Sequence, residues 1–226
     1  MRGRSWTCCT PSASNPGACC SAVSRVRLLS AALCFFCVAA TSDPCNQGTT
    51  YDMRTCWSEQ DRAANDGLKS AYARVVAALR KDGAATAPLT DAQVAWNAAR
   101  DKTCAFEYRQ YLPGTIAPLL GVECDTRMTQ ARTQRLVELR GALQSARGRA
   151  ALQAVSPAAQ AQLERIYVLY LDRLTADLRA SLTSAQTAWL VYRERACGVE
   201  GGRCLTALTD ERVAELKASW MGEVFW

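Results

Sequence analysis

Residues 89–107 read LTDAQVAWNAARDKTCAFE, and residues 182–200 read LTSAQTAWLVYRERACGVE. Nine of these nineteen positions are identical at a fixed offset of 93, with no gap, and they include Trp96 and Trp189. The match resumes at the next cysteine, where CDTRMTQARTQRL from Cys124 aligns with CLTALTDERVAEL from Cys204. Repetition on this scale predicts two copies of one structural unit.

The composition around the repeat is typical of helices. Ala, Leu, Arg, Glu and Gln dominate the chain after residue 40, and runs of β-branched residues are absent there. We therefore predict an all-α fold, a disulfide-stapled helical bundle built from two tandem three-helix repeats. The expected helices run from a Thr49 or Thr50 cap to Lys81, from Thr90 or Asp91 to Cys104 or slightly beyond, from about Cys124 to 140–146, and then over about 157–180, 183–197 and 204–220.

One stripe recurs on the second expected helix of each copy. Trp96, Arg100 and Cys104 stand at positions i, i+4 and i+8, so they share one helix face. The stripe is either a recognition surface or a core tryptophan with an arginine whose stem packs on the ring. We favour the core interpretation, because a shared core explains most simply why both copies keep the stripe.

The first forty residues differ from the rest of the chain. They contain four arginines and no acidic residue, and an apolar run from Leu28 to Ala40 follows Arg25 and Arg27. This run is shorter than the ~20 residues that a membrane-spanning helix needs, but it suits a secretory signal peptide. We predict cleavage after Ala40, a periplasmic or secreted mature protein and no membrane span after cleavage. The segment before Arg25 is long for a signal peptide, which is consistent with a true start further in, for instance at Val23.

The remaining chain is expected to hold a first repeat over residues 41–146 and a shorter second repeat over residues 147–226. Of the 27 basic residues in the chain, 23 lie beyond residue 40, where they face 21 acidic residues. The net charge of this part is therefore about +2, and its basic residues are interleaved with acidic ones. The sequence therefore contains no basic patch that would indicate nucleic-acid binding.

Six cysteines lie beyond residue 40, and an even number in an oxidising compartment predicts disulfides. They are Cys45, Cys56, Cys104, Cys124, Cys197 and Cys204. The second copy contains only Cys197 and Cys204, so parity pairs these two with each other. Their equivalents Cys104 and Cys124 should then pair as well, which leaves Cys45 with Cys56, although exchange between those two sets stays open. Closing a loop of about 20 residues stabilises by roughly 3 kcal/mol in the chain-entropy model.

The residue types restrict the chemistry that the protein can perform. The chain has no histidine, which excludes Ser-His and Cys-His catalytic pairs and histidine-ligated zinc. No CxxC motif occurs among the six cysteines, which argues against a redox motif and a zinc ribbon. We interpret carboxylate pairs such as Glu211 and Glu215 as solvated helix faces rather than as an acid–base pair. We therefore expect no catalytic residue, no metal and no cofactor.

Several motifs follow one another along the first copy. In chain order they are Thr50-x-x-Met53-x-x-Cys56, Gln93-x-x-Trp96-x-x-x-Arg100-x-x-x-Cys104, Gly114-Thr115-Ile116, Cys124 and Thr129-x-x-Arg132. Together they resemble the lysozyme inhibitor LprI-like family of small secreted bacterial helical proteins. The resemblance covers about Cys45 to Arg140, and in the second copy it begins near Ile166. It implies a secreted α-helical domain and points to animal-type lysozyme as a partner.

A lysozyme has a substrate cleft with two catalytic carboxyl groups, so a protein inhibitor needs a stiff segment that enters this cleft. The best candidate is the loop Ala105–Glu123, tied at its base by Cys104 and Cys124 and stiffened by two prolines. Its candidate contact residues combine types enriched at binding hot spots with turn residues: Phe106, Glu107, Tyr108, Arg109, Tyr111, Pro113 and Gly114. In this hypothesis Arg109 reaches a cleft carboxylate. The competing interpretation is that the aromatic residues fold back and cover the bundle.

The expected function is therefore steric inhibition of animal-type lysozyme. Animal lysozymes are strongly basic, and a mature inhibitor near +2 gains no steering from its net charge. The alternative is a cell-envelope interaction or stress protein that uses the same scaffold to bind another envelope partner and does not inhibit lysozyme. A lysozyme assay with the mature protein separates the two functions.

Overall fold

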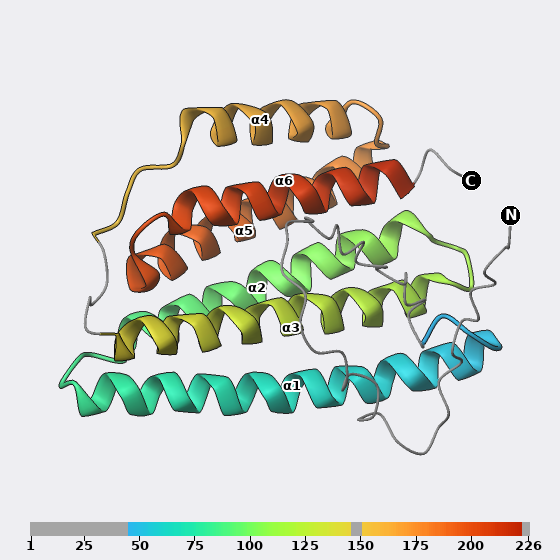
Figure 1. Ribbon diagram of the computed structural model, residues 1–226. Coiled ribbons are helices and arrows are strands. Elements are labelled where there is room, and N and C mark those ends of the chain that lie inside the picture. The colour runs from blue at the N-terminus through green and yellow to red at the C-terminus, as the bar shows by residue number, and fades with distance from the viewer. Residues whose placement is uncertain (1–44, 146–150, 223–226) are drawn as a thin grey trace, which may run out of the picture. The chain divides into compact units, whose positions relative to one another are not determined.

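The computed structural model describes residues 45–145 and 151–222, with side chains described up to Ser219. Within these ranges it contains six helices and no strand. The helices are α1 (Thr50–Lys81), α2 (Ala87–Gln110), α3 (Ala117–Gln144), α4 (Pro157–Leu171), α5 (Ala176–Glu200) and α6 (Cys204–Gly222) (Figure 1). The predicted all-α class is confirmed. The signal-peptide prediction for residues 1–40 lies outside the described residues.

Local sequence explains where several helices begin and end. Thr49 caps α1, because its hydroxyl accepts from the Asp52 backbone N–H at 3.2 Å while the Asp52 carboxylate accepts from the Thr49 backbone N–H at 3.0 Å. This reciprocal capping box fixes the first turn of the helix. Proline lies in the first turns of α2, α3 and α4, where its missing N–H costs nothing. Gly201 ends α5 with a φ of 70°, a left-handed conformation that favours glycine.

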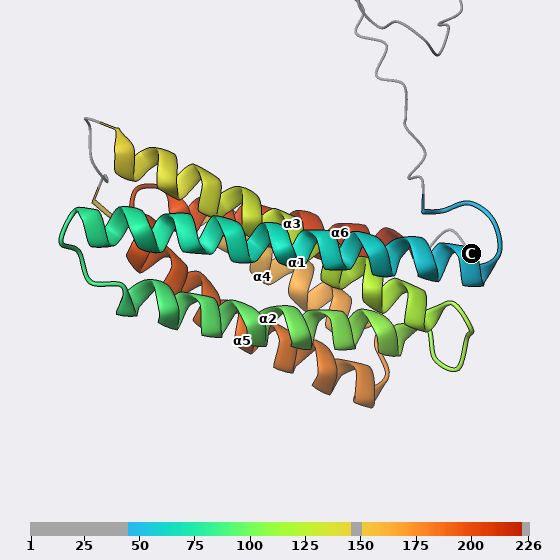
Figure 2. The ribbon, with the colours of Figure 1, turned by 90° about the horizontal axis from the view of Figure 1, so that it is seen from below.

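The two repeats are joined chiefly through their second helices. The most extensive helix–helix contact is between α2 and α5, which lie side by side, followed by the contact between α1 and α3 (Figure 2). In the second repeat, α4 packs on α6. All described residues belong to one compact unit, so the repeats share a core. The predicted boundary at 146/147 falls at residues that are not described, and it stays a prediction.

The repeated stripe lies in this shared core. Trp96 is 2% exposed and Trp189 is 3% exposed. The guanidinium carbons of Arg100 and Arg193 lie 5.0 and 5.1 Å from the centroids of the corresponding tryptophan rings. The stripe is therefore a core tryptophan with an arginine packed on its ring, as we favoured.

Three disulfides cross-link the described residues. They are Cys45–Cys56, Cys104–Cys124 and Cys197–Cys204, the pairing that parity favoured. The first lies beside a small cluster formed with Trp57 and Leu119, where the start of α1 meets the start of α3. The other two each join the second helix of a repeat to its third helix.

Four helix boundaries differ from the sequence-based expectation, and one of them is the start of α5, which lies at Ala176 rather than at 183. α2 continues to Gln110 and α3 begins at Ala117, so the expected loop Ala105–Glu123 is mostly helical and its irregular part is residues 111–116. α4 ends at Leu171, because the chain turns before α5 and buries Leu174 in the core. No glycine or proline marks this turn in the sequence.

Candidate functional site

The turn between α2 and α3, residues 111–116, is the most elaborate connection of the first repeat. The backbone N–H of Gly114 donates to the carbonyl oxygen of Tyr111 at 2.7 Å, and the Leu112–Pro113 peptide bond is cis. A Cβ atom at Gly114 would lie 2.7 Å from that carbonyl oxygen, which is closer than real Cβ contacts, so the turn requires glycine here. A second turn follows, in which the Ala117 N–H donates to the Gly114 carbonyl oxygen at 3.2 Å.

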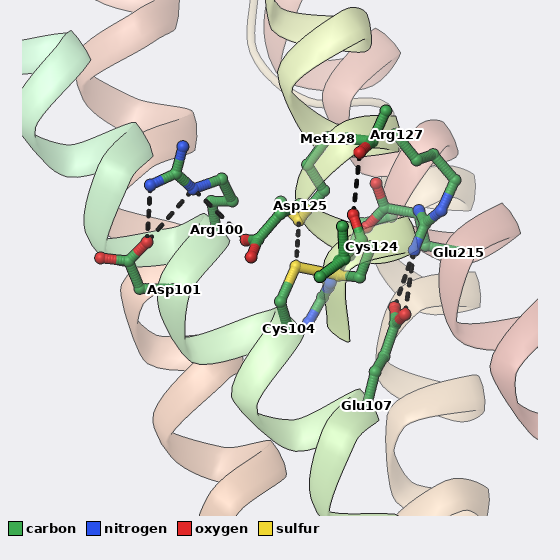
Figure 3. Close-up of a disulfide and its surroundings, with 12 residues drawn as sticks. Arg100, Asp101, Cys104, Glu107, Cys124, Asp125, Arg127, Met128 and Glu215 are labelled. Carbon is green, nitrogen blue, oxygen red and sulfur yellow. Dashed lines mark hydrogen bonds and ion pairs between the residues drawn. A yellow bond between two sulfur atoms is a disulfide. The ribbon is translucent and has the colours of Figure 1, made fainter. Parts of the chain in front are cut away.

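Two cross-links hold the helices on either side of the turn. The Cys104–Cys124 disulfide lies inside α2 and α3, between one and two helical turns from the ends of both. In addition, the Nη2 of Arg127 donates to both carboxylate oxygens of Glu107, at 2.8 and 3.1 Å (Figure 3). A covalent bond and a charge-assisted pair therefore fix the base from which the turn projects.

The structure separates the predicted contact residues into two groups. Tyr108, Arg109, Pro113 and Gly114 are exposed, and Tyr111 is half-buried. Phe106 is only 2% exposed, and its ring meets that of Tyr170 edge-on, with the centroids 5.7 Å apart. The expectation that Phe106 offers surface to a partner is wrong, because this ring fills the core between the two repeats.

Sequence reasoning missed two exposed apolar residues of the turn. Leu112 is 51% exposed and Ile116 is 37% exposed. Their signal in the sequence is their position beside Pro113 and Gly114, since a tight turn cannot bury every apolar side chain that it carries. Together with Tyr108, they form an exposed apolar surface around the turn.

A groove of about 410 Å³ lies beside the turn, between the end of α2, the start of α3 and α6. Its charged lining consists of Glu107, Glu123, Glu215 and Arg127. Burial raises the pKa of the Glu107 carboxyl, and the charge and hydrogen bond of Arg127 oppose that rise. The lining thus contains three carboxylates and the guanidinium of Arg127, and Glu215 also accepts from the buried Arg212 at 3.0 Å. Figure 3 shows Glu107, Arg127 and Glu215 gathered on one side of the disulfide.

The carboxylates of α6 are not simply solvated, contrary to our interpretation of the sequence. Glu211 accepts from Arg135 at 2.7 Å, and Glu215 accepts from Arg212 at 3.0 Å. Arg212 itself is only 1% exposed. Both glutamates thus balance the charge of arginines that helix packing has removed from water.

No group of three or more His, Cys, Asp or Glu residues within 45–145 and 151–222 is arranged to hold a metal ion. None of the helices in those ranges combines the length and the apolar character that crossing a membrane requires.

The fold and the site define a disulfide-linked, all-helical protein built from a duplicated three-helix unit. The sequence profile of the lysozyme inhibitor LprI family matches residues 40–136 and again residues 141–216, so the chain belongs to this family. The two matched segments agree with a second, partial copy of the domain. Membership supports a general inhibitor-like function and, together with the disulfides, an extracytoplasmic location.

The fold also resembles a solved structure. The crystal structure of an uncharacterized protein from Burkholderia thailandensis matches with a TM-score of 0.62 and 21% sequence identity, covering 76% of this chain and 88% of that one. At this identity the similarity concerns the fold alone. No curated protein matches the sequence significantly.

Proposed function

We propose that this protein is a periplasmic or secreted inhibitor of animal-type lysozyme that occludes the substrate cleft with its α2–α3 turn. Family membership supports the target, and the three disulfides support an oxidising compartment. In this proposal residues 1–40 form a signal peptide that is removed after Ala40. The protein performs no reaction and uses no cofactor.

The rigid, exposed turn of the first repeat is the observation that supports this proposal most strongly. In the second repeat, only residues 201–203 connect α5 to α6, so nothing comparable projects there. The first repeat instead presents the exposed side chains of Tyr108, Arg109 and Leu112 around the turn. Because the disulfide and the Glu107–Arg127 pair fix the base, little conformational entropy is lost when a partner closes over the turn.

The chemistry of a lysozyme cleft fits these side chains. Steric occlusion requires only that the turn fill the space of the substrate. A guanidinium such as that of Arg109 pairs well with a carboxylate in a site that excludes water. The apolar surface of Leu112 and Tyr108 supplies contact area that becomes buried on binding.

The test is a lysozyme-activity assay with the mature protein and a double variant, Arg109→Ala with Leu112→Ser. We expect wild type to inhibit and the double variant to need a roughly tenfold higher concentration or more, because it removes a charged and an apolar anchor. The matched control is Val168→Ser on α4, since Val168 is 53% exposed and Leu112 is 51% exposed. Point variants are preferable to shortening residues 105–123, which would also delete the core residue Phe106.

Each outcome distinguishes the two functions that the sequence suggests. Equal inhibition by the double variant and by wild type would exclude the turn as the occluding element. A folded wild-type protein that leaves lysozyme active at large excess would favour the alternative, a cell-envelope protein with another partner. The melting temperatures of all variants should agree within a few degrees, because the changed residues are exposed.

A further inference from the structure

The duplication allows the groove beside the turn to be compared with its counterpart in the other repeat. In the first repeat, the Arg132 Nε donates to the amide oxygen of Gln93 at 3.2 Å. In the second, the Arg212 Nε donates to the equivalent Gln186 at 3.1 Å. Both arginines are buried, at 2% and 1% exposure. The third helix therefore sits against the second helix in the same register in both repeats, and equivalent residues occupy equivalent places.

In the second repeat, the glutamate at the end of α5 is held by arginines of the first repeat. The Nη2 of Arg135 lies 2.6 Å from the Glu200 carboxylate, and the Nη1 of Arg132 lies 3.5 Å from it. The other end of the Arg135 guanidinium donates to Glu211 at 2.7 Å. One guanidinium thus bridges two carboxylates, and the cavity beside it measures only about 40 Å³.

The equivalent site in the first repeat lacks this guanidinium. Glu107 is the counterpart of Glu200, and Glu215 on α6 is the counterpart of Arg135 on α3. The residue equivalent to the arginine beside Glu200 is therefore a carboxylate at the site of Glu107. The groove of about 410 Å³ opens at this place. Burial raises the pKa of Glu107, and the negative charge of Glu215 adds to that rise although Arg127 opposes it.

The walls of the groove suit a long basic side chain as well as its charged end. Tyr111, Leu120, Ala214 and Ala218 contribute apolar or aromatic surface to the lining, and the three glutamates contribute the charge. Lysine and arginine bury their aliphatic stems against such walls while the charged head meets carboxylates. A small molecular cation would leave those walls uncovered.

We propose that the groove binds a guanidinium or ammonium side chain of the partner protein. This side chain would occupy the place beside Glu107 that is equivalent to the place of Arg135 beside Glu200. The identity of the partner rests on the proposed function, in which it is a basic residue on the lysozyme surface beside the cleft. The groove and the turn are adjacent because Tyr111 belongs to both, so one partner engages the two together. Local carboxylates then attract a basic lysozyme although the net charge of the inhibitor does not.

The first test introduces at position 215 of α6 the arginine that α3 carries at its equivalent position 135. In Glu215→Arg, the protein's own guanidinium fills the groove, and we expect affinity for animal-type lysozyme, measured by calorimetry, to fall roughly tenfold or more. The matched control is Asp210→Arg, which makes the same change of charge at an exposed position of α6 outside the groove. We expect the control to bind nearly as wild type does. Equal binding by Glu215→Arg and by wild type would overturn the proposal.

A second variant tests the charge of Glu215 while keeping a hydrogen-bond acceptor for Arg212. Glu215 accepts a hydrogen bond from the buried Arg212, and its replacement by arginine leaves that group unbalanced. Glu215→Gln keeps an acceptor for Arg212 and removes the negative charge, so it should stay folded by circular dichroism and still lose several-fold in affinity. Retained affinity in a folded Glu215→Gln protein, with no change in its salt dependence, would contradict the proposal.

A second probe separates failure of the groove from failure of the proposed function. We would titrate the mature protein with a short arginine-containing peptide and with the same peptide carrying uncharged citrulline. Saturable binding of the arginine peptide that Glu215→Arg abolishes supports the groove even if lysozyme itself is not bound, in which case only the proposed partner is wrong. Equal binding of the two peptides would overturn the proposal.

Discussion

The two repeats share one architecture but differ in the length of the first helix, in the number of disulfides and in the connection before the third helix. The first has a 32-residue opening helix, an extra disulfide and a projecting turn before its third helix. The second opens with a 15-residue helix and joins α5 to α6 through three residues. At the matching glutamates, Glu200 is clamped by two arginines from the other repeat, whereas Glu107 lines an open groove. In the proposed function, the second repeat therefore supports the fold while the first displays the binding surface.

The largest expected effect concerns the aromatic contact between the repeats. Phe106→Ala should lower the free energy of unfolding by about 4 kcal/mol, because a fully buried ring is lost and a cavity remains. The control is Val199→Ala, at the equivalent position of α5, where a smaller buried side chain should cost about 2 kcal/mol. Denaturant unfolding of the mature, oxidised protein measures both values.

The same pair of variants tests the role of Phe106. If Phe106→Ala unfolds no more easily than Val199→Ala yet loses lysozyme inhibition, then Phe106 acts at the partner surface and its assignment to the core is wrong. We expect the reverse result, a destabilised protein that still inhibits wherever it is folded.

The next largest effect concerns the two equivalent glutamates. Glu200→Ala should cost about 3 kcal/mol, because it leaves Arg132, only 2% exposed, without its carboxylate partner. Glu107→Ala should cost about 1 kcal/mol, because Arg127 is 46% exposed and water can solvate it when its partner is gone. Thermal unfolding at neutral pH compares the two, and equal losses would contradict the division into a clamped and an open site.

Features encoded by the repeat itself could be predicted from the sequence. The helical class follows from the composition, whereas the shared tryptophan stripe and the favoured disulfide pairing follow from equivalent residues of the two copies, such as Trp96 and Trp189. The end of α2 could not be placed, because the extended helix buries Phe106 against Tyr170 of the other repeat, a contact distant in sequence. The turn after α4 carries no glycine or proline to reveal it.

The candidate site was predicted only in part. The sequence indicated the turn through Pro113 and Gly114, and both are exposed as expected. The groove was missed, because Glu107 and Glu215 belong to different repeats and only the packing of the helices brings them together. The alignment of the two copies already pairs Glu107 with Glu200 and Glu215 with Arg135. That Glu107 lacks the counterpart of the Arg135–Glu200 ion pair becomes visible only when the structure shows which helices face each other.

The smallest expected effect compares the N-caps of the two opening helices. Thr49→Ala should destabilise by about 1 kcal/mol, because the capping bond from the Asp52 N–H is lost. Ser156, the N-cap of α4, makes no side-chain capping bond, so Ser156→Ala should change stability by less than about 0.5 kcal/mol. Thermal unfolding of both variants at pH 7 measures this difference, and a larger loss in Ser156→Ala would show that the caps had been ranked wrongly.

The pH dependence of Thr49→Ala reveals how the cap works. Hydrogen bonds from the Thr49 side chain and backbone lower the pKa of the Asp52 carboxyl in the folded protein. The ionised carboxylate therefore stabilises the fold above the usual carboxyl pKa of about 4, and this contribution disappears as the pH falls through the lowered pKa. Replacing Thr49 removes the side-chain bond that contributes most to the shift, so the difference in stability between wild type and Thr49→Ala should shrink on acidification. A difference that stays constant from pH 7 to pH 3 would mean that the hydroxyl stabilises α1 without any help from the Asp52 charge.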